Sequence, residues 1–286
     1  MAPSDLSDIG RLKFSDLPDA EALVAEVGWN QVRADWRIFL DFGTVYAVRG
    51  GERVVATAAT LPFGGRCAWI SMVLVTAGHR RHGVATRLLD RCIADITAAR
   101  IVPVLDATPA GRAVYAPLGF HDAWGFARLI SQQRSIRPLG PDVVAIRPIT
   151  DSVWPALCAY DAAVFGADRS QILTCMRGRL PSADLFAERD GRVVGLLLGR
   201  DGRTASHLGP LIADDDATAA ALLDRALGQI SGTVYVDLAD AKVAVRAWLE
   251  ASGFSLQRPF TRMLHHRRES FNDIGRTFAV IGPEFG

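Results

Sequence analysis

The 286-residue chain carries 32 Lys and Arg residues against 31 Asp and Glu residues, which gives a formal net charge of +1 at pH 7. This balance excludes proteins that bind nucleic acid or an anionic membrane mainly through bulk positive charge. Hydrophobic residues make up 49% of the chain, which is typical of a globular protein with substantial cores. A chain of this length favours two domains over one.

The sequence contains neither a metal or redox motif of cysteines nor a targeting or membrane-spanning segment. The four cysteines have no C-x-x-C spacing, and no His, Cys, Asp or Glu residues have the spacing of a metal site. Residues 1–10 are polar and do not form a signal peptide, and no apolar run reaches membrane-spanning length. We therefore expect a cytoplasmic protein with reduced thiols and without metal or membrane association.

The first 66 residues contain predicted helices and strands in turn. A first strand is expected at residues 9–14. Apolar residues at helical spacing predict helices over residues 17–27 and 31–40. Strand-like segments follow at residues 44–48 and 54–60, separated by a turn with two glycines.

The most informative stretch runs from Ala68 to Leu89. Residues 69–75 form a nearly continuous apolar run rich in β-branched side chains, which predicts a strand buried on both faces. The sequence then breaks into GHRRHG at residues 78–83, and apolar residues resume at helical spacing from Val84. A buried strand therefore turns through a loop rich in glycine and cations into an amphipathic helix.

This junction has the chemistry of an anion site. The first turn of a helix leaves backbone N–H groups without partners and carries the positive end of the helix dipole, so it suits a phosphate. Gly83 lets a ligand approach the backbone closely, Ala85 is nearly as small, and Arg80 and Arg81 add positive charge. The pattern is neither a Walker motif nor G-x-G-x-x-G. A plain strand–helix turn with solvated arginines is the alternative.

A second strand over residues 101–106 completes a parallel pair with the central strand. The expected fold class is therefore α+β, with helices layered on a mostly antiparallel sheet that contains one parallel pair. A short helix carrying Tyr115 follows and ends before Gly119-Phe120.

Two motifs in this half resemble those of the GNAT superfamily of acyl-CoA N-acyltransferases. Arg80-x-x-Gly83-x-Ala85 resembles the pyrophosphate-binding pattern Gln/Arg-x-x-Gly-x-Gly/Ala, and Tyr115-x-x-Leu-Gly-Phe resembles the second motif. The resemblance covers most of residues 9–131. It implies two parallel strands that splay apart around the pantetheine chain, acetyl-CoA as co-substrate, no metal, and direct transfer to an amine. It places the cofactor on Val73, Leu74, Val75, Arg80, Arg81, His82, Gly83, Val84, Ala85 and Thr86.

Transfer from a thioester needs a neutral amine, donors for the carbonyl oxygen and a proton for the leaving thiolate. Backbone N–H groups around Leu74 are candidates for the carbonyl donors. Tyr115 is the candidate general acid, and the alternative is a tyrosine that only fills the core. The general base stays open among Glu26, Asp35, Asp106 and a water chain.

Residues 142–266 repeat the pattern of the first half. ATRLLDR at residues 85–91 matches AAALLDR at residues 219–225, and Gly119-Phe120 matches Gly253-Phe254 at the same offset of 134. The repeat predicts two domains, residues 1–135 and 142–286, joined by a linker at 136–141. At this offset Arg80, Arg81, His82 and Gly83 become Asp214, Asp215, Asp216 and Ala217, and Tyr115 becomes Leu249.

Three carboxylates at a helix start would repel a pyrophosphate but would cap the helix well. The second half therefore resembles the degenerate C-terminal GNAT domain of tandem bacterial acetyltransferases. Asp161 and Asp168 are candidates to receive a cationic amine, opposite an apolar wall of Trp29 and Trp36; simple helix capping is the alternative. Residues 277–281 are expected to dock as an added strand.

The sequence thus predicts an acetyl-CoA-dependent N-acetyltransferase that acts on the amine of a small molecule. A non-catalytic acyl-CoA-binding or regulatory module and a protein N-acetyltransferase are the alternatives. The sequence leaves open the identity of the amine and the oligomeric state.

Overall fold

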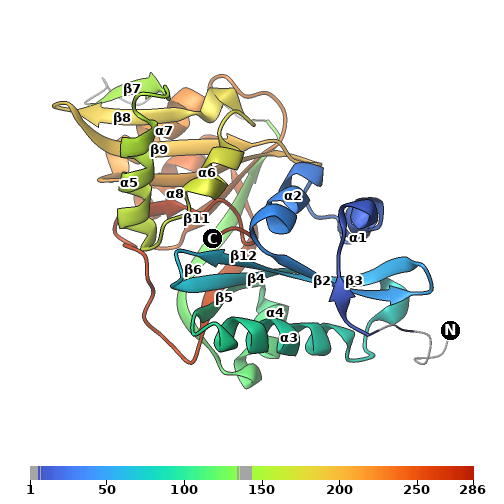
Figure 1. Ribbon diagram of the computed structural model, residues 1–286. Coiled ribbons are helices and arrows are strands. Elements are labelled where there is room, and N and C mark those ends of the chain that lie inside the picture. Colours follow the sequence, from blue (N-terminus) through green and yellow to red (C-terminus); the bar gives the residue numbers. More distant parts are fainter. Residues whose placement is uncertain (1–5, 7, 134, 136–143) are drawn as a thin grey trace. The chain divides into compact units, whose positions relative to one another are not determined.

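The computed structural model describes residue 6, residues 8–133, residue 135 and residues 144–286, and it divides into two compact units. Unit 1 runs to Leu105 and also holds residues 202–204 and Phe285, while unit 2 holds the rest of the chain. The chain passes from the first unit into the second within strand β5, Val102–Ala107 (Figure 1).

Unit 1 is a sheet with helices on both faces. In Figure 1, helices α1 and α2 lie above strands β2 to β4, and α3 lies below them. The sheet order is β1-β2-β3-β4-β5. The elements are β1 (Gly10–Arg11), α1 (Leu17–Glu26), α2 (Arg33–Phe42), β2 (Thr44–Gly50), β3 (Arg53–Phe63), β4 (Cys67–Val75), α3 (Val84–Ala98) and the start of β5.

The helices and strands predicted for unit 1 are confirmed, although the first strand is shorter than expected. The strand predicted at residues 9–14 is reduced to Gly10–Arg11, because Phe14–Asp16 forms a 3-10 turn. The backbone N–H of Lys13 donates to the Asp16 carboxylate at 2.8 Å, which holds this turn closed. Strands β4 and β5 form the expected parallel pair, and the other pairings of this sheet are antiparallel.

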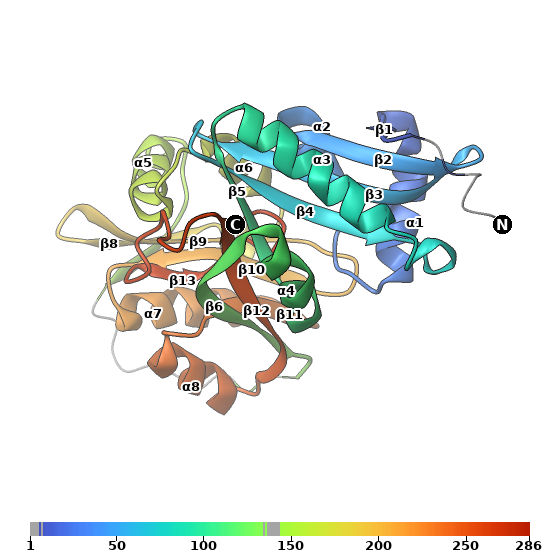
Figure 2. The ribbon, with the colours of Figure 1, turned by 90° about the horizontal axis from the view of Figure 1, so that it is seen from below.

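Unit 2 is also a layered sheet, in the order β12-β6-β11-β13-β10-β9-β8-β7. Figure 2 shows α5 and α7 on opposite faces of strands β8 to β10. Among the described residues, no helix is both long and apolar enough to cross a membrane. The elements are α4 (Pro109–Tyr115), β6 (Phe120–Ser131), β7 (Ala145–Pro148), α5 (Trp154–Phe165), α6 (Ser170–Met176), β8 (Leu185–Arg189), β9 (Arg192–Arg200), β10 (Ser206–Ala213), α7 (Asp216–Leu227), β11 (Val234–Ala239), α8 (Val243–Ala251), β12 (Ser255–His265) and β13 (Thr277–Ala279).

The compact units do not coincide with the sequence repeats. Strand β6 belongs to the first repeat by sequence, but it pairs with β11 and β12 of the second, with Arg128 opposite Asp237 and Phe126 opposite Phe260. The expected division at residues 135 and 142 therefore separates the repeats, whereas the compact units divide between Leu105 and Asp106. The expected linker at residues 136–141 lies outside the described residues.

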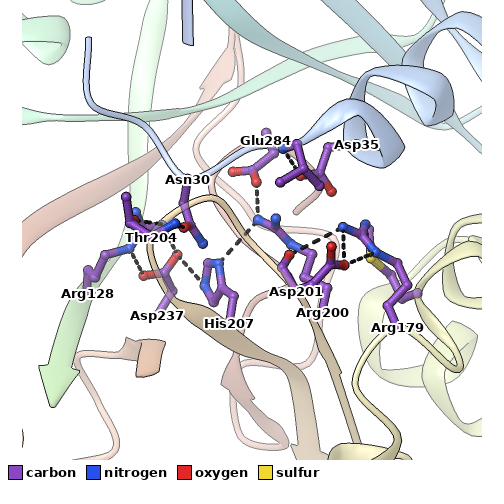
Figure 3. Close-up of polar contacts among 12 residues, drawn as sticks. Asn30, Asp35, Arg128, Arg179, Arg200, Asp201, Thr204, His207, Asp237 and Glu284 are labelled. Atoms are coloured by element: carbon purple, nitrogen blue, oxygen red, sulfur yellow. Dashed lines mark hydrogen bonds and ion pairs between the residues drawn. The ribbon is translucent and has the colours of Figure 1, made fainter. Parts of the chain in front are cut away.

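A chain of buried polar side chains crosses the sheet of unit 2 (Figure 3). Arg128 donates two hydrogen bonds of 2.7 Å to the Asp237 carboxylate. His207 Nε2 lies 3.1 Å from Asp237, and its Nδ1 lies 3.2 Å from Arg200, which pairs in turn with Glu284. Burial lowers the pKa of His207, so its ring is neutral at pH 7 and the two arginines balance the two carboxylates.

Asp237→Asn should lower the free energy of unfolding by about 3–5 kcal/mol, because it leaves Arg128 as a buried charge without its counterion. The measurement is urea unfolding followed by tryptophan fluorescence. Asp122→Asn is the matched control, since Asp122 pairs with Arg112 at a partly exposed site, where ion pairs contribute about 0–1 kcal/mol. Equal losses in the two variants would contradict the role given to the buried chain.

Candidate functional site

The candidate site begins at an irregularity in strand β4. The register of β4 against β3 shifts between the pairs Thr57↔Leu74 and Ala59↔Ser71, and Met72 between them has a φ of +52°. The Thr57 hydroxyl donates to the Met72 carbonyl at 2.9 Å. Such a bulge redirects the backbone, and a positive φ at a residue other than glycine is uncommon enough to mark a constrained position.

Strands β4 and β5 stop pairing just before this bulge. Their parallel pairing ends at Trp69↔Val104, although β4 continues to Val75. Leu74 is buried, whereas Val73 and Val75 keep part of their surface exposed. The separation agrees with the splayed pair that the sequence resemblance implies.

The turn after β4 leads to an open helix start. Gly83 precedes α3 with a φ of +73°, and a Cβ built there would meet nothing within 4 Å. Glycine is therefore favoured for its left-handed backbone, and the space in front of it is free. Gly83 offers no capping side chain, so the first-turn N–H groups of α3 have neither an intrahelical acceptor nor a cap from this position.

The cations of the turn differ in what they contact. Arg81, His82 and Gly83 are exposed to solvent. Arg80 instead folds back, because its Nε donates to the Val75 carbonyl at 2.9 Å. The first-turn N–H groups, the positive end of the α3 dipole and Arg81 together form a site suited to an anion.

The three carboxylates considered as general bases are all engaged in hydrogen bonds. Glu26 accepts from the Thr76 hydroxyl and the Ala77 N–H, and these two bonds lower its pKa. Asp35 is fully buried and accepts from the Val32 N–H at 2.9 Å. Asp106 of unit 2 receives two bonds of 2.8 Å from Arg262. The geometry favours none of the three as a base.

The two tryptophans predicted to line a substrate wall differ in exposure. Trp36 is fully buried on α2 with its ring edge-on to Phe39, and Trp29 is only half-buried. The Trp36 Nε1 has no hydrogen-bond partner among the described residues, and the same holds for the Gln31 Oε1 and the Ser71 Oγ. Because buried polar atoms are nearly always paired, these three are candidates to contact a ligand.

Tyr115 lies in unit 2 at the end of α4. Its ring is tilted against Phe120 at a centroid distance of 6.2 Å, and burial raises the pKa of its phenol. A raised pKa keeps the proton on the hydroxyl at neutral pH, as a general acid requires. The role of Tyr115 stays a prediction.

Asp161 and Asp168 are occupied in ways that do not favour binding of an amine. Both oxygens of Asp161 receive hydrogen bonds from Arg169, at 2.8 and 2.9 Å, and the pair is buried. Asp168 accepts from the Ser170 N–H at 2.9 Å, at the start of α6. The structure therefore gives both carboxylates local bonding partners, one in an ion pair and one at a helix start.

In the second repeat, the N-terminus of α7 corresponds to that of α3, but a side chain of the protein caps it. Asp215 precedes α7 and accepts from the Thr218 N–H at 2.7 Å, so a carboxylate occupies the place of a bound anion. Arg189 donates to Asp215 at 3.0 Å, and Tyr160 donates to Asp214 at 2.8 Å. The capping role expected for these aspartates is confirmed for Asp215.

The strand gap of the second repeat is closed as well. Strands β10 and β11 pair in parallel from Ser206↔Val234 to Leu208↔Val236, and β13 then enters between them. Ala279 of β13 lies opposite Leu211 of β10 and Leu238 of β11. The added strand expected from the tail is therefore confirmed. It lies between β10 and β11, which correspond in the second repeat to β4 and β5 of the first.

Signals for some of these features were present in the sequence. Ser71 is the only polar residue in the apolar run of β4, and its isolation there is a usable sign of a ligand contact. Gln31 belongs to no motif. Its unpaired state follows only from the fold.

Comparison with known proteins gives matches to both repeats. The model of the acetyltransferase (GNAT) family matches residues 14–120, and that of an acetyltransferase (GNAT) domain matches residues 157–279. An uncharacterised N-acetyltransferase of Bacillus subtilis, YitH, is 22% identical over 270 residues, which cover 92% of this chain and 93% of YitH.

Two solved structures share the fold over 91% or more of this chain. A putative acetyltransferase of Pyrococcus horikoshii has a TM-score of 0.78 at 18% identity, with 100% of this chain and 98% of that chain covered. A tandem GNAT protein from the clavulanic acid biosynthesis pathway has a TM-score of 0.63 at 16% identity, covering 91% of this chain and 98% of its own.

Asp215→Ala should lower the free energy of unfolding by about 1 kcal/mol, because it removes the acceptor at the N-terminus of α7. Asp215→Ser keeps an oxygen at the capping position and should lose clearly less. Urea unfolding of both variants checks this. A serine variant as unstable as the alanine variant would show that the ion pair with Arg189 matters more than the cap.

Proposed function

Since the chain is a tandem GNAT protein, we propose that its first repeat carries out N-acetyl transfer from acetyl-CoA to the amine of a small molecule. The observation that carries the proposal is the contrast between the two helix starts. The start of α3 is open and lies beside exposed cations, whereas Asp215 caps the start of α7. Only the first of the two is suited to a pyrophosphate.

The proposed cofactor site uses three parts of unit 1. The N–H groups of Val84, Ala85 and Thr86 would hold the pyrophosphate, with Arg81 supplying positive charge. The pantetheine chain would follow β4 beyond Trp69, where pairing with β5 ends. The backbone around Leu74 would then donate to the thioester oxygen as it gains negative charge.

The proposed reaction is a direct displacement. The neutral amine attacks the thioester carbonyl carbon, a tetrahedral intermediate forms, and the C–S bond breaks. The thiolate takes a proton from the Tyr115 hydroxyl, the amine gives up a proton to water, and a proton from water returns to the Tyr115 phenolate. A water chain is the proposed base because Glu26, Asp35 and Asp106 are each held by hydrogen bonds.

The acceptor is proposed to meet the unpaired polar atoms of unit 1. The Gln31 Oε1 can accept from an amine N–H, and the Trp36 Nε1 can only donate. The Ser71 hydroxyl can do either. This set suits a small amine that also carries a hydrogen-bond acceptor, such as a hydroxyl or carboxylate.

Release of free thiol from acetyl-CoA, measured with a panel of small amines, tests the proposed reaction. Turnover with at least one small amine is the expected result. Binding of CoA without turnover of any amine or peptide would favour a non-catalytic acyl-CoA-binding or regulatory module. Turnover with peptides alone would favour a protein N-acetyltransferase.

Gly83→Asp should abolish acetyl-CoA binding, with a loss of about a hundredfold or more, because it places a carboxylate against the pyrophosphate. Gly83→Asn is the matched control, since asparagine has a similar volume, tolerates the left-handed backbone and adds no charge. It should bind more tightly than the aspartate variant. Calorimetric titration checks both, and wild-type affinity in Gly83→Asp would exclude this turn as the cofactor site.

Tyr115→Phe should lower kcat by roughly ten- to a thousandfold and change the KM for acetyl-CoA less, because it removes only the proton given to the thiolate. Phenylalanine keeps the ring against Phe120, so the fold should be unaffected. Steady-state kinetics under conditions limited by chemistry make the measurement. An unchanged kcat would mean that Tyr115 only fills the core.

A further inference from the structure

We propose that Glu26 is a positioning residue that fixes the cofactor turn from the end of helix α1. The inference rests on the proposed function, because it assigns Glu26 to the binding of acetyl-CoA by that turn. It replaces the role of general base that the sequence left open for this carboxylate.

One carboxylate joins the end of α1 to the first residues after β4. Glu26 Oε2 accepts from the Thr76 hydroxyl at 2.7 Å, and Oε1 accepts from the Ala77 N–H at 2.6 Å. The guanidinium of Arg80 lies 3.6 Å from the same Oε1. Glu26 therefore reaches three residues of the turn across about fifty positions of sequence.

Other bonds also hold the turn: the Thr76 N–H donates to the Val55 carbonyl at 2.9 Å, and the Arg80 Nε donates to the Val75 carbonyl at 2.9 Å. Ala77 and Gly78 are exposed, and the turn's own backbone bonds include His79 N–H to Thr76 at 2.9 Å and Arg80 N–H to Ala77 at 3.4 Å. Helix α1, by contrast, is seated by buried residues such as Leu23 and Val24. Glu26 is thus the side chain through which the seated helix α1 holds this exposed turn at Thr76 and Ala77.

The hydrogen bonds that Glu26 accepts suit a residue that positions the turn and do not suit a general base. Its two strongest hydrogen bonds stabilise the ionised carboxylate and lower its pKa below the usual 4.5. A base would have to take up a proton during the reaction, and doing so would weaken the bonds to Thr76 and Ala77. An anchor keeps them throughout.

The carboxylate also lies on the wall of a pocket of about 210 Å³ between α1 and β3, which is lined as well by Ala22, Val54 and Thr76. We expect a small carboxylate such as formate to enter this pocket and take the place of a truncated side chain at position 26.

The test compares three variants of the full chain. Glu26→Ala should weaken acetyl-CoA binding about tenfold in calorimetric titration, as expected for the loss of charge-assisted hydrogen bonds. Glu26→Gln keeps an oxygen for the Ala77 N–H and should lose less, with kcat close to wild type. Glu21→Ala is the matched control on the same helix, because Glu21 pairs with Arg33 at the surface, and it should change the affinity less than twofold.

Hydrogen exchange of the ligand-free protein tests the anchor independently of the cofactor. The Ala77 amide should exchange at least about tenfold faster in Glu26→Ala than in wild type or Glu21→Ala, because it loses its acceptor. This result stands even if wild-type protein binds no acetyl-CoA, an outcome that would overturn the proposed function alone. Formate should restore acetyl-CoA affinity to Glu26→Ala.

Three results would overturn the inference. The first is a Glu26→Ala protein whose Ala77 exchange and acetyl-CoA affinity equal those of Glu21→Ala. The second is a Glu26→Gln protein with wild-type acetyl-CoA affinity, a kcat reduced about a hundredfold and no acidic limb in its pH profile, which would identify a base. The third is a Glu26→Ala protein in which amides throughout α1 exchange faster along with that of Ala77, which would trace the loss to a disturbed α1.

Discussion

The two repeats differ in what satisfies the first-turn N–H groups of two equivalent helices, α3 and α7. A helix N-terminus carries unpaired donors and partial positive charge, so a side chain of its own chain, water or a bound anion must occupy it. At α7 the occupant is the carboxylate of Asp215, which accepts from the Thr218 N–H at 2.7 Å. At α3 the residue in the N-cap position is Gly83, with open space before it. The same backbone geometry therefore yields a ligand site in one repeat and a closed turn in the other.

The tail of the chain closes the second repeat in a second way. Strand β13 enters between β10 and β11, where Val280 donates its N–H to the Asp237 carbonyl at 3.1 Å. Backbone groups that a ligand would otherwise meet are thus paired within the chain. The same sheet also buries the Asp237 carboxylate between Arg128, at 2.7 Å, and His207, at 3.1 Å.

The sequence predicted the features that rest on local patterns. The apolar run of β4, the turn at Gly83 and the aspartate cap of α7 follow from hydrophobic periodicity and capping chemistry, and each is where the pattern placed it. The added strand of the tail was also expected. Helix ends moved by one or two residues, as they do when fraying and 3-10 turns set the boundary.

The features that the sequence did not predict arise from contacts between distant residues. The pairing of β6 with β11 joins strands of different repeats, and hydrophobic alternation is the same whichever partner a strand takes. The hydrogen bond from the Ala77 N–H to Glu26 joins residues that no local spacing connects. The same holds for the buried polar contacts that link Arg128, through Asp237, His207 and Arg200, to Glu284. Gln31 and the unpaired Trp36 Nε1 gave no signal of their own, because the burial of a polar atom follows only from the fold.

A map of the backbone amides that acetyl-CoA protects from hydrogen exchange tests most directly which helix start holds the cofactor. We expect strong protection at the start of α3, residues 84–87, and no change at the start of α7, residues 216–219. Protection at both helix starts, or at α7 alone, would contradict the claim that one repeat holds the cofactor and the other is closed by its own side chains.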